Sequence, residues 1–394
     1  MTSSSVPVHM RRVGFDPDAE LARLRTGAKI SRVTLFPGAE AWLVTRYHDV
    51  KAVLGDASRF STRTGPGVNP LLSSQSDRSG FLLGYDPPDH TRLRKMLTAQ
   101  FTVARMRRLR PRVEAVVTEH LDAMAAIGSP IDLMQSFALP IPSLVICELL
   151  GVPYADRDEF QSQSRARVDL SKGPDERTAA AEHTRRYLGE LVARQRRTPG
   201  EDMLGTLVRE HGDEVGEAEL TGVADFLLMA GHETTANMLG LGVLLLLEQP
   251  DQLAMLRDPA NVDTTVEELL RYLSVVHCCI PRMATEDVVI GDTTIAAGDL
   301  VICSFSAANR DPEMIGADVN LDRFDLTRGI TSHVAFGYGM HRCLGAPLAR
   351  MEMQIAYPSL FERFPGLRLD VPLDEVSFRS FALVFGLDAL PVAW

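Results

Sequence analysis

The chain has few cysteines, very few lysines and no apolar N-terminal run. Its five cysteines include no C-x-x-C pair, which argues against a disulfide framework and against a zinc site built from close cysteine pairs; they are Cys147, Cys278, Cys279, Cys303 and Cys343. The N-terminal segment MTSSSVPVHMRRVGF lacks the apolar stretch of a signal peptide or a membrane anchor. We therefore expect a reducing, cytoplasmic setting without a membrane, with roughly the first ten residues disordered.

Negative charge prevails along the chain, which carries a formal net charge of −11. This balance argues against nucleic acid as a general partner. Residues 90–113 are the exception, because they hold eight arginines and lysines and no acidic residue. On charge alone, this segment is either a solvated helix face or a DNA-binding patch. The near absence of lysine is typical of GC-rich genomes and suggests an actinobacterial source.

Helical patterns dominate the 394 residues, and only short strands interrupt them. Residues 42–50 begin as a strand and turn helical, and further strands are expected at 287–290 and 300–305. The helices are expected at 91–126, 140–150, 155–170, 178–197 and 217–249. The sequence thus predicts a single mainly α domain over residues 1–394 with a smaller β-rich part.

Two segments read as mobile connections near a binding site. Residues 61–84 are rich in glycine, proline and serine, and connections of this length in compact proteins often serve as lids or binding loops. The stretch SKGPDE, residues 171–176, breaks two helical patterns.

The longest helical pattern, residues 217–249, would span about 50 Å as one helix. A membrane span is excluded because Asp225, His232 and Glu233 interrupt the pattern. Glu233 and Thr234 lie mid-way along this apolar helix, where a polar group is costly unless it is hydrogen-bonded or functional. The Thr234 hydroxyl can bond back to the carbonyl of Ala230. Taken alone, the pair is also compatible with a satisfied core threonine beside a surface glutamate.

Residues 336–350, FGYGMHRCLGAPLAR, place Cys343 between a glycine-rich turn and a helix. The helix is predicted by Pro347 in its first turn and by an apolar stripe, which comprises Leu344, Leu348, Met351 and Ile355. At a helix N-terminus, the macrodipole and free N–H groups favour a thiolate and lower the pKa of a thiol. Gly337 and Gly339 can take positive φ, and Gly345 leaves room for a flat cofactor. The alternatives are a buried core cysteine, or His341 and Cys343 as two zinc ligands.

The combined pattern resembles the cytochrome P450 family at three separate places. The loop around the cysteine matches the family's haem-ligand loop, through Phe336, Gly337, Gly339, His341, Cys343 and Gly345. The hexapeptide AGHETT, residues 230–235, resembles the oxygen-binding groove, and Glu268 with Arg271 resembles the E-x-x-R element. The resemblance implies the cytochrome P450 fold, with a long central helix over a buried haem, and is strongest to bacterial members that tailor secondary metabolites.

The resemblance also implies roles for the residues of these motifs. Cys343 would be the axial iron ligand of haem b, in a pocket bounded by Phe336, Gly337, Gly345 and Ala230. Thr234 would direct protons to the oxygen, Glu233 would relay them from solvent, and His232 is a candidate accessory to this relay. Glu268, Arg271 and Arg323 would form a buried structural network, although a surface pair at i,i+3 is equally compatible with the local pattern. The propionates would be held by His90, Arg94, Arg282 and His341, each of which could otherwise be a solvent-exposed side chain.

Substrate and partner can be predicted only by likeness to the family. The substrate is expected to be a bulky small molecule, first a macrolide or polyene polyketide and alternatively a steroid or terpenoid, which reacts with O2. Its contacts are predicted at Leu228, Val276, His277, Cys278, Cys279, Ile280, Phe381 and Ala382, where the two adjacent cysteines are read as pocket lining or as a redox pair. The basic residues of 90–113 would dock an acidic ferredoxin. A peroxygenase and a non-catalytic haem sensor remain the alternative functions.

Overall fold

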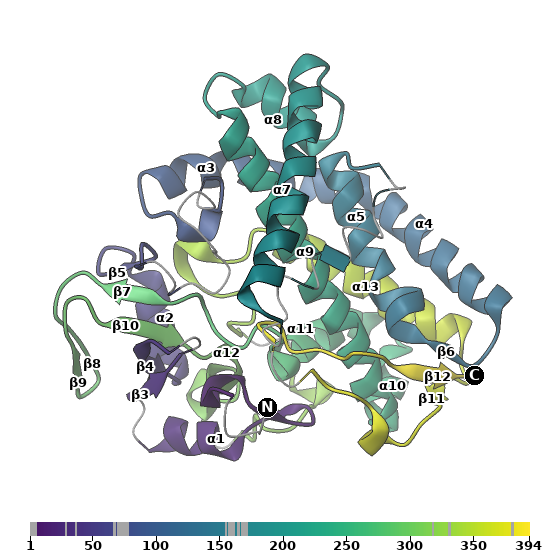
Figure 1. The fold of residues 1–394 in the computed structure, drawn as a ribbon. Helices are drawn as coiled ribbons and strands as arrows, with labels where there is room; N and C mark the ends of the chain where they lie inside the picture. Colours follow the sequence, from purple (N-terminus) through teal and green to yellow (C-terminus); the bar gives the residue numbers. More distant parts are fainter. Residues whose placement is uncertain are drawn as a thin grey trace.

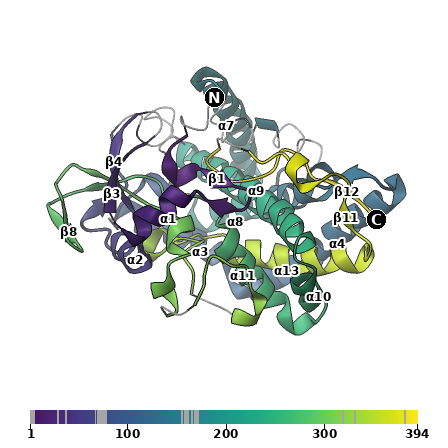
Figure 2. The same ribbon diagram turned by 90° about the horizontal axis from the view of Figure 1, so that it is seen from below.

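The computed structural model describes most of the chain, namely residues 6–27, 30–35, 38–65, 68, 79–153, 156, 162–163, 166, 172–316, 319–329, 332–379 and 382–394. Helices make up the larger part of it, and a mixed sheet occupies one end of the molecule (Figures 1 and 2). The described helices are α1 Ala19–Thr26, α2 Tyr47–Gly55, α3 Asp89–Thr98, α4 Val103–Ile127, α5 Pro140–Leu150, α7 Pro174–Arg197, α8 Met203–His211, α9 Glu217–Leu247, α10 Pro250–Leu256, α11 Val262–Leu273, α12 Phe305–Ala308 and α13 Ala346–Arg363.

The main sheet joins segments from distant parts of the sequence, in the order β3-β4-β10-β7-β5. β10 runs parallel to β4 and antiparallel to β7, with Val301 opposite Arg282. A second sheet, β11-β12-β6, lies near the C-terminus (Figure 1). The strands are β1 Arg12–Val13, β2 Asp16–Pro17, β3 Ile30–Thr34, β4 Glu40–Val44, β5 Phe60–Ser61, β6 Ile131–Asp132, β7 Arg282–Ala284, β8 Val288–Ile290, β9 Thr293–Ile295, β10 Leu300–Cys303, β11 Arg368–Leu369 and β12 Pro391–Ala393.

The long helix α9 forms the centre of the helical part. It contacts α5, α7, α13, α11 and α10, so that most of its residues from Leu220 to Leu246 are buried on every side. The predicted long helix is therefore confirmed. No single described helix is long and apolar enough to cross a membrane. Among the described helices, only α9 and α10 taken together pass on length and composition, and the chain bends by 117° between them.

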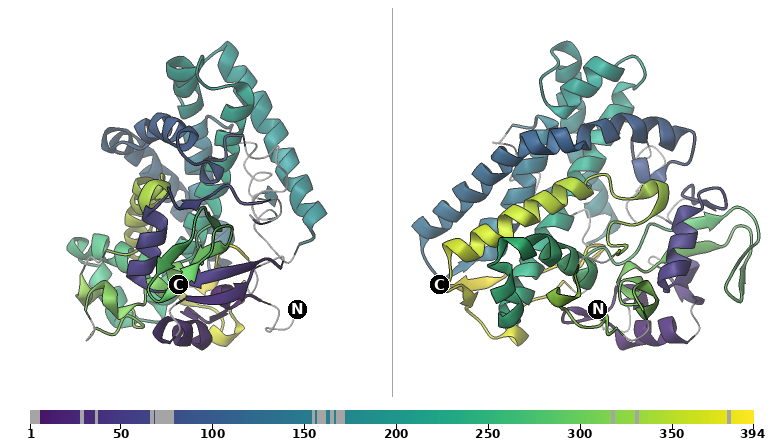
Figure 3. Two further views of the ribbon diagram at one scale, coloured as in Figure 1. Left: turned by 90° about the vertical axis from the view of Figure 1, so that its left-hand side faces the viewer. Right: turned by 180° about the vertical axis from the view of Figure 1, so that it is seen from behind.

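α13 lies beside α4 on the far side of α9 (Figure 3). Gly345 caps its N-terminus, and Pro347 stands in its first turn as predicted. Its apolar stripe is buried, from Leu348 to Ile355. The helix after Cys343 is thus held by its whole apolar face, which fixes where the cysteine loop begins.

Some expectations about local structure differ from what is observed. The predicted helix 91–126 is two helices, α3 and α4, because Thr102 is extended and caps α4 by accepting a hydrogen bond from the backbone N–H of Arg105. Residues 6–10 are not disordered, since Val6, Val8, His9 and Met10 are buried. Most of the expected helix 155–170 and of the connection 61–84 lies outside the described residues.

Candidate active site

The loop before α13 presents Cys343 from a turn that requires glycine. Gly337 and Gly339 have φ of 70° and 71°, the left-handed region that was predicted for them. A Cβ at Gly339 would lie 2.2 Å from the carbonyl oxygen of Leu54 in α2, so the turn also packs too closely for a side chain. The backbone N–H of Cys343 donates to the carbonyl of Phe336 at 2.8 Å, which closes the loop.

The environment of Cys343 differs in one respect from the expectation for a helix N-terminus. Burial raises the pKa of the thiol, and the backbone N–H groups of Gly345 and Ala346 and the charge of Arg94 only partly oppose this. The predicted net lowering is therefore wrong for the protein without a metal, although the N–H groups act in the expected direction. The side chain is nevertheless exposed. Cys343 is therefore accessible although the surrounding protein raises its pKa.

The central helix is accessible at a matching place. Within the buried stretch of α9, Ala230, Gly231 and Thr234 are partly exposed, and they share one helix face. No Cβ contact is found within 4 Å of Gly345, which leaves open space at the start of α13 as expected. The Thr234 hydroxyl donates to the carbonyl of Ala230 at 2.8 Å, so the predicted back-bond is confirmed.

Four cationic or imidazole side chains from three segments surround one volume. His90 and Arg94 come from α3, Arg282 from β7, and His341 from the cysteine loop. The rings of His90 and His341 have centroids 4.3 Å apart. Burial, together with the charges of Arg94 and Arg282, lowers the pKa of His90 to about 4. For His341, burial and the same two charges lower the pKa to about 2.

Three of these four side chains carry buried nitrogens that no described residue pairs with. Both ring nitrogens of His90 and of His341, and Nε of Arg282, are buried without a hydrogen-bond partner among the described residues. Buried polar nitrogens without partners are rare in folded proteins, because each costs the free energy of its lost hydration. Carboxylates placed among them would accept their hydrogen bonds and offset the positive charge. The residues therefore fit a bound group with more than one carboxylate, as haem has.

Glu233 is fully buried and is held by residues that sequence reasoning did not single out. Arg379 Nη1 donates to its Oε2 at 2.8 Å, and Asn237 Nδ2 donates to the same oxygen at 3.3 Å. Arg379 also lies 3.7 Å from Asp388, which is 57% exposed. A Cβ at Gly386 would lie 1.9 Å from Asn237, so the C-terminal segment that carries Arg379 approaches α9 directly. Only tertiary packing brings Arg379 to the acid, and no motif marks it.

The E-x-x-R pair forms a bidentate ion pair that is completely buried. Nε and Nη2 of Arg271 each donate to Glu268 at 2.7 Å, and both side chains are 0% exposed. Arg271 also donates to three carbonyls, those of Asn309, Leu321 and Arg323. A solvent-exposed i,i+3 ion pair, the alternative left open by the sequence, is therefore excluded for Glu268 and Arg271.

The expected third member of this network was misassigned. Arg323 is exposed and contributes only its backbone carbonyl. The cation beside Glu268 is Arg328, whose Nε lies 3.6 Å from the carboxylate and whose side chain is 7% exposed. Arg323 therefore takes part in the network through its backbone, and its side chain stays outside it.

A second ion pair ties the same helix to the cysteine loop. Glu267 accepts two hydrogen bonds from Arg350, at 2.5 and 2.8 Å, and contacts His333 at 3.1 Å. Burial alone would raise the pKa of Glu267, but the hydrogen bonds from Arg350 and His333 outweigh it and lower the pKa to about 2. The Arg350 guanidinium lies over the Phe336 ring, 4.6 Å from its centroid. Glu267 thereby braces the loop that carries Cys343.

The segments predicted to contact substrate meet where the C-terminal part of the chain passes the end of α11. Val276 pairs with Val384, and Cys278 with Ser304, in isolated antiparallel bridges. His277 is buried and hydrogen-bonds Ala382, whereas Val276 and the stretch from Cys278 to Ile280 are partly exposed. Leu228 is buried on α9, and Phe381 lies outside the described residues.

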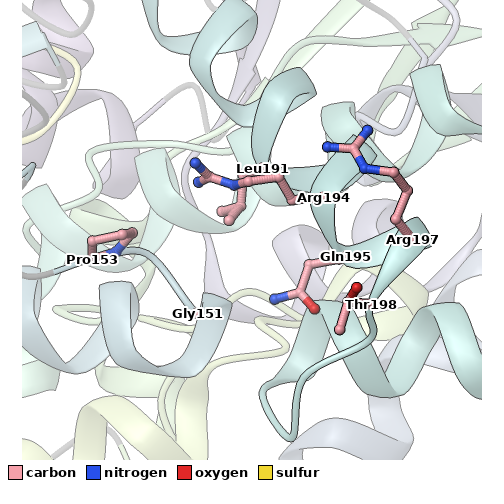
Figure 4. Close-up of a pocket in the computed structure, with 7 residues that line it drawn as sticks. All are labelled: Gly151, Pro153, Leu191, Arg194, Gln195, Arg197 and Thr198. Atoms are coloured by element: carbon pink, nitrogen blue, oxygen red, sulfur yellow. The ribbon is translucent and has the colours of Figure 1, made fainter.

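A separate open pocket lies between the end of α5 and the C-terminal part of α7 (Figure 4). Its lining comprises Gly151, Pro153, Leu191, Arg194, Gln195, Arg197 and Thr198. It includes none of the residues predicted for the haem site or for the substrate. The candidate active site is therefore defined by Cys343, the partly exposed residues of α9 and the cluster around His90 and His341.

Comparison with known proteins decides the family. The family model described as Cytochrome P450 matches residues 260–376, which include the E-x-x-R pair and the cysteine loop. The chain is 44% identical to Cytochrome P450 FAS1 of Rhodococcoides fascians, over 100% of this chain and 99% of that protein. It belongs to the cytochrome P450 family.

Other relatives of this P450 are named as a synthase, as a P450 from antibiotic biosynthesis and as a complex with filipin I. Pentalenic acid synthase of Streptomyces avermitilis is 44% identical over 100% of this chain and 99% of its own. The P450 StaH, from biosynthesis of the glycopeptide antibiotic A47934, superposes with a TM-score of 0.88 at 44% identity and covers 99% of this chain and 100% of its own. CYP105P1 in complex with filipin I superposes with a TM-score of 0.91 at 42% identity, and the match covers 98% of this chain and 97% of that chain. The protein is thus a P450 monooxygenase, and the predicted P450 fold is confirmed.

Proposed function

We propose that Cys343 is the axial thiolate ligand of haem b in this monooxygenase, and that residues 1–394 form a single P450 domain. The family implies haem iron held by a cysteine, and Cys343 is the exposed cysteine that lies in a glycine turn and at a helix N-terminus. Bound haem would supply reductive activation of O2, with the thiolate favouring cleavage of the O–O bond. Metal coordination would keep the sulfur deprotonated in spite of its burial.

The single observation that carries this proposal is the cluster of unpartnered buried nitrogens on His90, His341 and Arg282. These atoms, with Arg94, would hold the two propionates of a bound haem. Each histidine can hydrogen-bond a propionate oxygen as a neutral donor, so the cluster does not depend on protonation.

Proton delivery would be divided between Thr234 and Glu233. Thr234 lies on the accessible face of α9, and its hydroxyl would turn its single proton from the carbonyl of Ala230 towards the oxygen being reduced. Glu233, one position earlier, would resupply that proton. Its buried pairing with Arg379 keeps the carboxylate in one orientation, and Asp388 lies on the solvent side of Arg379. His232, which is buried beside this pair, stays a candidate accessory to the relay.

The substrate that we propose is a bulky secondary metabolite, in the first place a macrolide or polyene polyketide, with hydroxylation as the reaction and epoxidation as a second outcome. Relatives named for a pentalenic acid synthase, for a filipin I complex and for glycopeptide antibiotic biosynthesis support natural products as the class. A steroid or terpenoid is the alternative. Contacts would come from Leu228, the 276–280 segment and Ala382.

Electrons would come from an acidic ferredoxin that docks on the basic face of α3 and α4. Arg107 and Arg108 are exposed there, whereas Arg92, Arg110 and Arg112 are paired with glutamates. The charge of Arg94 reaches Cys343, which indicates that this face is close to the metal side of the loop. Attraction between opposite charges would speed this encounter and weaken with salt.

The test is the haem spectrum of the purified protein. The reduced carbon monoxide complex should show the thiolate-type band, which Cys343→Ala should abolish and Cys147→Ala should retain. Polyketides, steroids and terpenoids are then screened for a low- to high-spin change, followed by product analysis. Product with NADPH, ferredoxin and reductase supports the monooxygenase; product with peroxide alone would indicate a peroxygenase, and haem without any turnover a sensor.

A further inference from the structure

Three of the five cysteines lie together at the segment predicted to line the substrate pocket. Cys278 and Cys279 precede β7, and Cys303 ends β10. Cys278 lies opposite Ser304 in an antiparallel bridge, so Cys279 and Cys303 are directly opposite each other in the same pairing. The backbone N–H of Cys279 donates to the carbonyl of Cys303 at 3.0 Å.

The sulfur of Cys279 replaces a backbone acceptor in this pairing. The backbone N–H of Cys303 donates to Sγ of Cys279 at 3.2 Å, and the two thiols are close enough to influence each other's pKa. Opposite residues in an antiparallel pair have Cα atoms about 4.5 to 5.5 Å apart, which lies within the range of about 4.4 to 6.8 Å found across disulfides. A bond between the two sulfurs therefore requires side-chain rotation and no shift of the strands.

The two thiols are chemically unequal. Cys279 is partly exposed, whereas Cys303 is 0% exposed. The hydrogen bond from Cys303 and the charge of Arg282 lower the pKa of Cys279 against the effect of burial. Burial raises the pKa of Cys303 and of Cys278. Cys279 is thus the more exposed residue and the better nucleophile, and Cys303 lies opposite it, where it can react with a sulfenic acid formed on Cys279.

We infer that Cys279 and Cys303 are a peroxide-sensitive thiol pair that closes to a disulfide and fixes the 276–280 segment to β10. The oxidant is hydrogen peroxide. The Cys279 thiolate attacks one peroxide oxygen, the O–O bond breaks, and hydroxide leaves and is protonated to water, which leaves a sulfenic acid. The Cys303 sulfur then attacks Cys279, the S–O bond breaks, and hydroxide leaves with the Cys303 proton as a second water. Two thiols give up two electrons and peroxide accepts them.

The cross-link would act on the pocket wall. β10 pairs with β7 through Val301 and Arg282, so the disulfide would lie beside the strand that carries a proposed propionate ligand. It would join the partly exposed stretch from Cys278 to Ile280 to the main sheet and reduce its freedom to adapt to a substrate. A dithiol reductant would reverse it. The inference does not depend on which substrate is bound.

The test uses the reduced, haem-loaded protein. It is treated with the lowest dose of hydrogen peroxide that changes its thiol content, and its Soret absorbance is followed. Thiols titrated after denaturation should fall from five to three and return with dithiothreitol. Mass spectrometry should show the tryptic peptides 272–282 and 283–310 joined by a disulfide.

Matched variants assign the bond. After the same dose, Cys279→Ser should keep all four remaining thiols, and Cys303→Ser should lose at most one, as a sulfenic acid on Cys279 that has no Cys303 to close onto. Cys278→Ser and Cys147→Ser should each lose two. A bond between Cys278 and Cys279, found within the single peptide 272–282, would overturn the inference. Loss of the Soret band before any loss of thiol would overturn it as well, because another group would then be the preferred target of peroxide.

Discussion

The propionate cluster predicts an unusual pH dependence for the protein without haem. His90 is 2% exposed, and burial with the charges of Arg94 and Arg282 lowers its pKa from 6.5 to about 4. Asp86 opposes this shift, and His341 is the ring packed against it. A pKa that is lower in the folded state contributes stability above the unfolded value, and this stability is lost as pH falls.

The magnitude follows from that shift. The difference between the unfolded and folded pKa of His90 corresponds to about 3 kcal/mol of unfolding free energy. This stability is lost as pH falls from 6.5 through 4. Between pH 7 and pH 5, roughly 2 kcal/mol of the unfolding free energy should disappear through His90 alone. With haem bound, propionate anions would favour the charged imidazole, so the loaded protein should lack this loss.

The assay is urea unfolding of the haem-free protein at several pH values, followed by tryptophan fluorescence. His90→Gln should flatten the fall in unfolding free energy between pH 7 and pH 5 by roughly 2 kcal/mol relative to the unmutated protein. His48→Gln, at an exposed histidine on α2, is the matched control and should leave the slope unchanged. Equal slopes for His90→Gln and the unmutated protein would refute the reasoning.

Three further outcomes follow from the ion pairs. Arg328→Met should lower the unfolding free energy by about 1–3 kcal/mol, whereas Arg323→Met should change it by less than about 0.5, as measured by denaturant titration. Glu267→Gln should cost about 3 kcal/mol at pH 7, and this difference should shrink as pH falls from 4.5 towards 2. Arg379→Gln should lower product per NADPH at least about 10-fold and release more peroxide, because Glu233 loses the cation that orients it, while haem content stays unchanged. Arg379→Lys should restore part of the product formed per NADPH. Equal effects of the Arg328 and Arg323 changes, or full coupling in Arg379→Gln, would contradict these assignments.

Local patterns predicted the elements that carry the site. The helix after Cys343, the positive φ of Gly337 and Gly339, and the back-bond of Thr234 each depend on a few neighbouring residues. The sequence was less informative at helix boundaries, since Thr102 interrupts an otherwise continuous periodic pattern by capping a new helix. Periodicity records which face is buried and does not record where a cap breaks the helix.

Charge pairing was the harder part to predict. The i,i+3 spacing of Glu268 and Arg271 was visible, but the next cation in that network is Arg328 and not Arg323. Arg379 reaches Glu233 across 146 residues of sequence. Pairs of this kind are set by how separate segments pack, so no local spacing identifies them.

The sequence by itself was enough to identify a P450 monooxygenase, because the short motifs around Cys343, Thr234 and Arg271 together match that family. The tertiary structure alone decided which groups meet across the fold. It placed unpartnered nitrogens around one volume, paired Glu233 with Arg379, and set Cys279 against Cys303. The physical reason is that burial and hydrogen bonding depend on distance in space, which the order of residues along the chain specifies only through the whole fold.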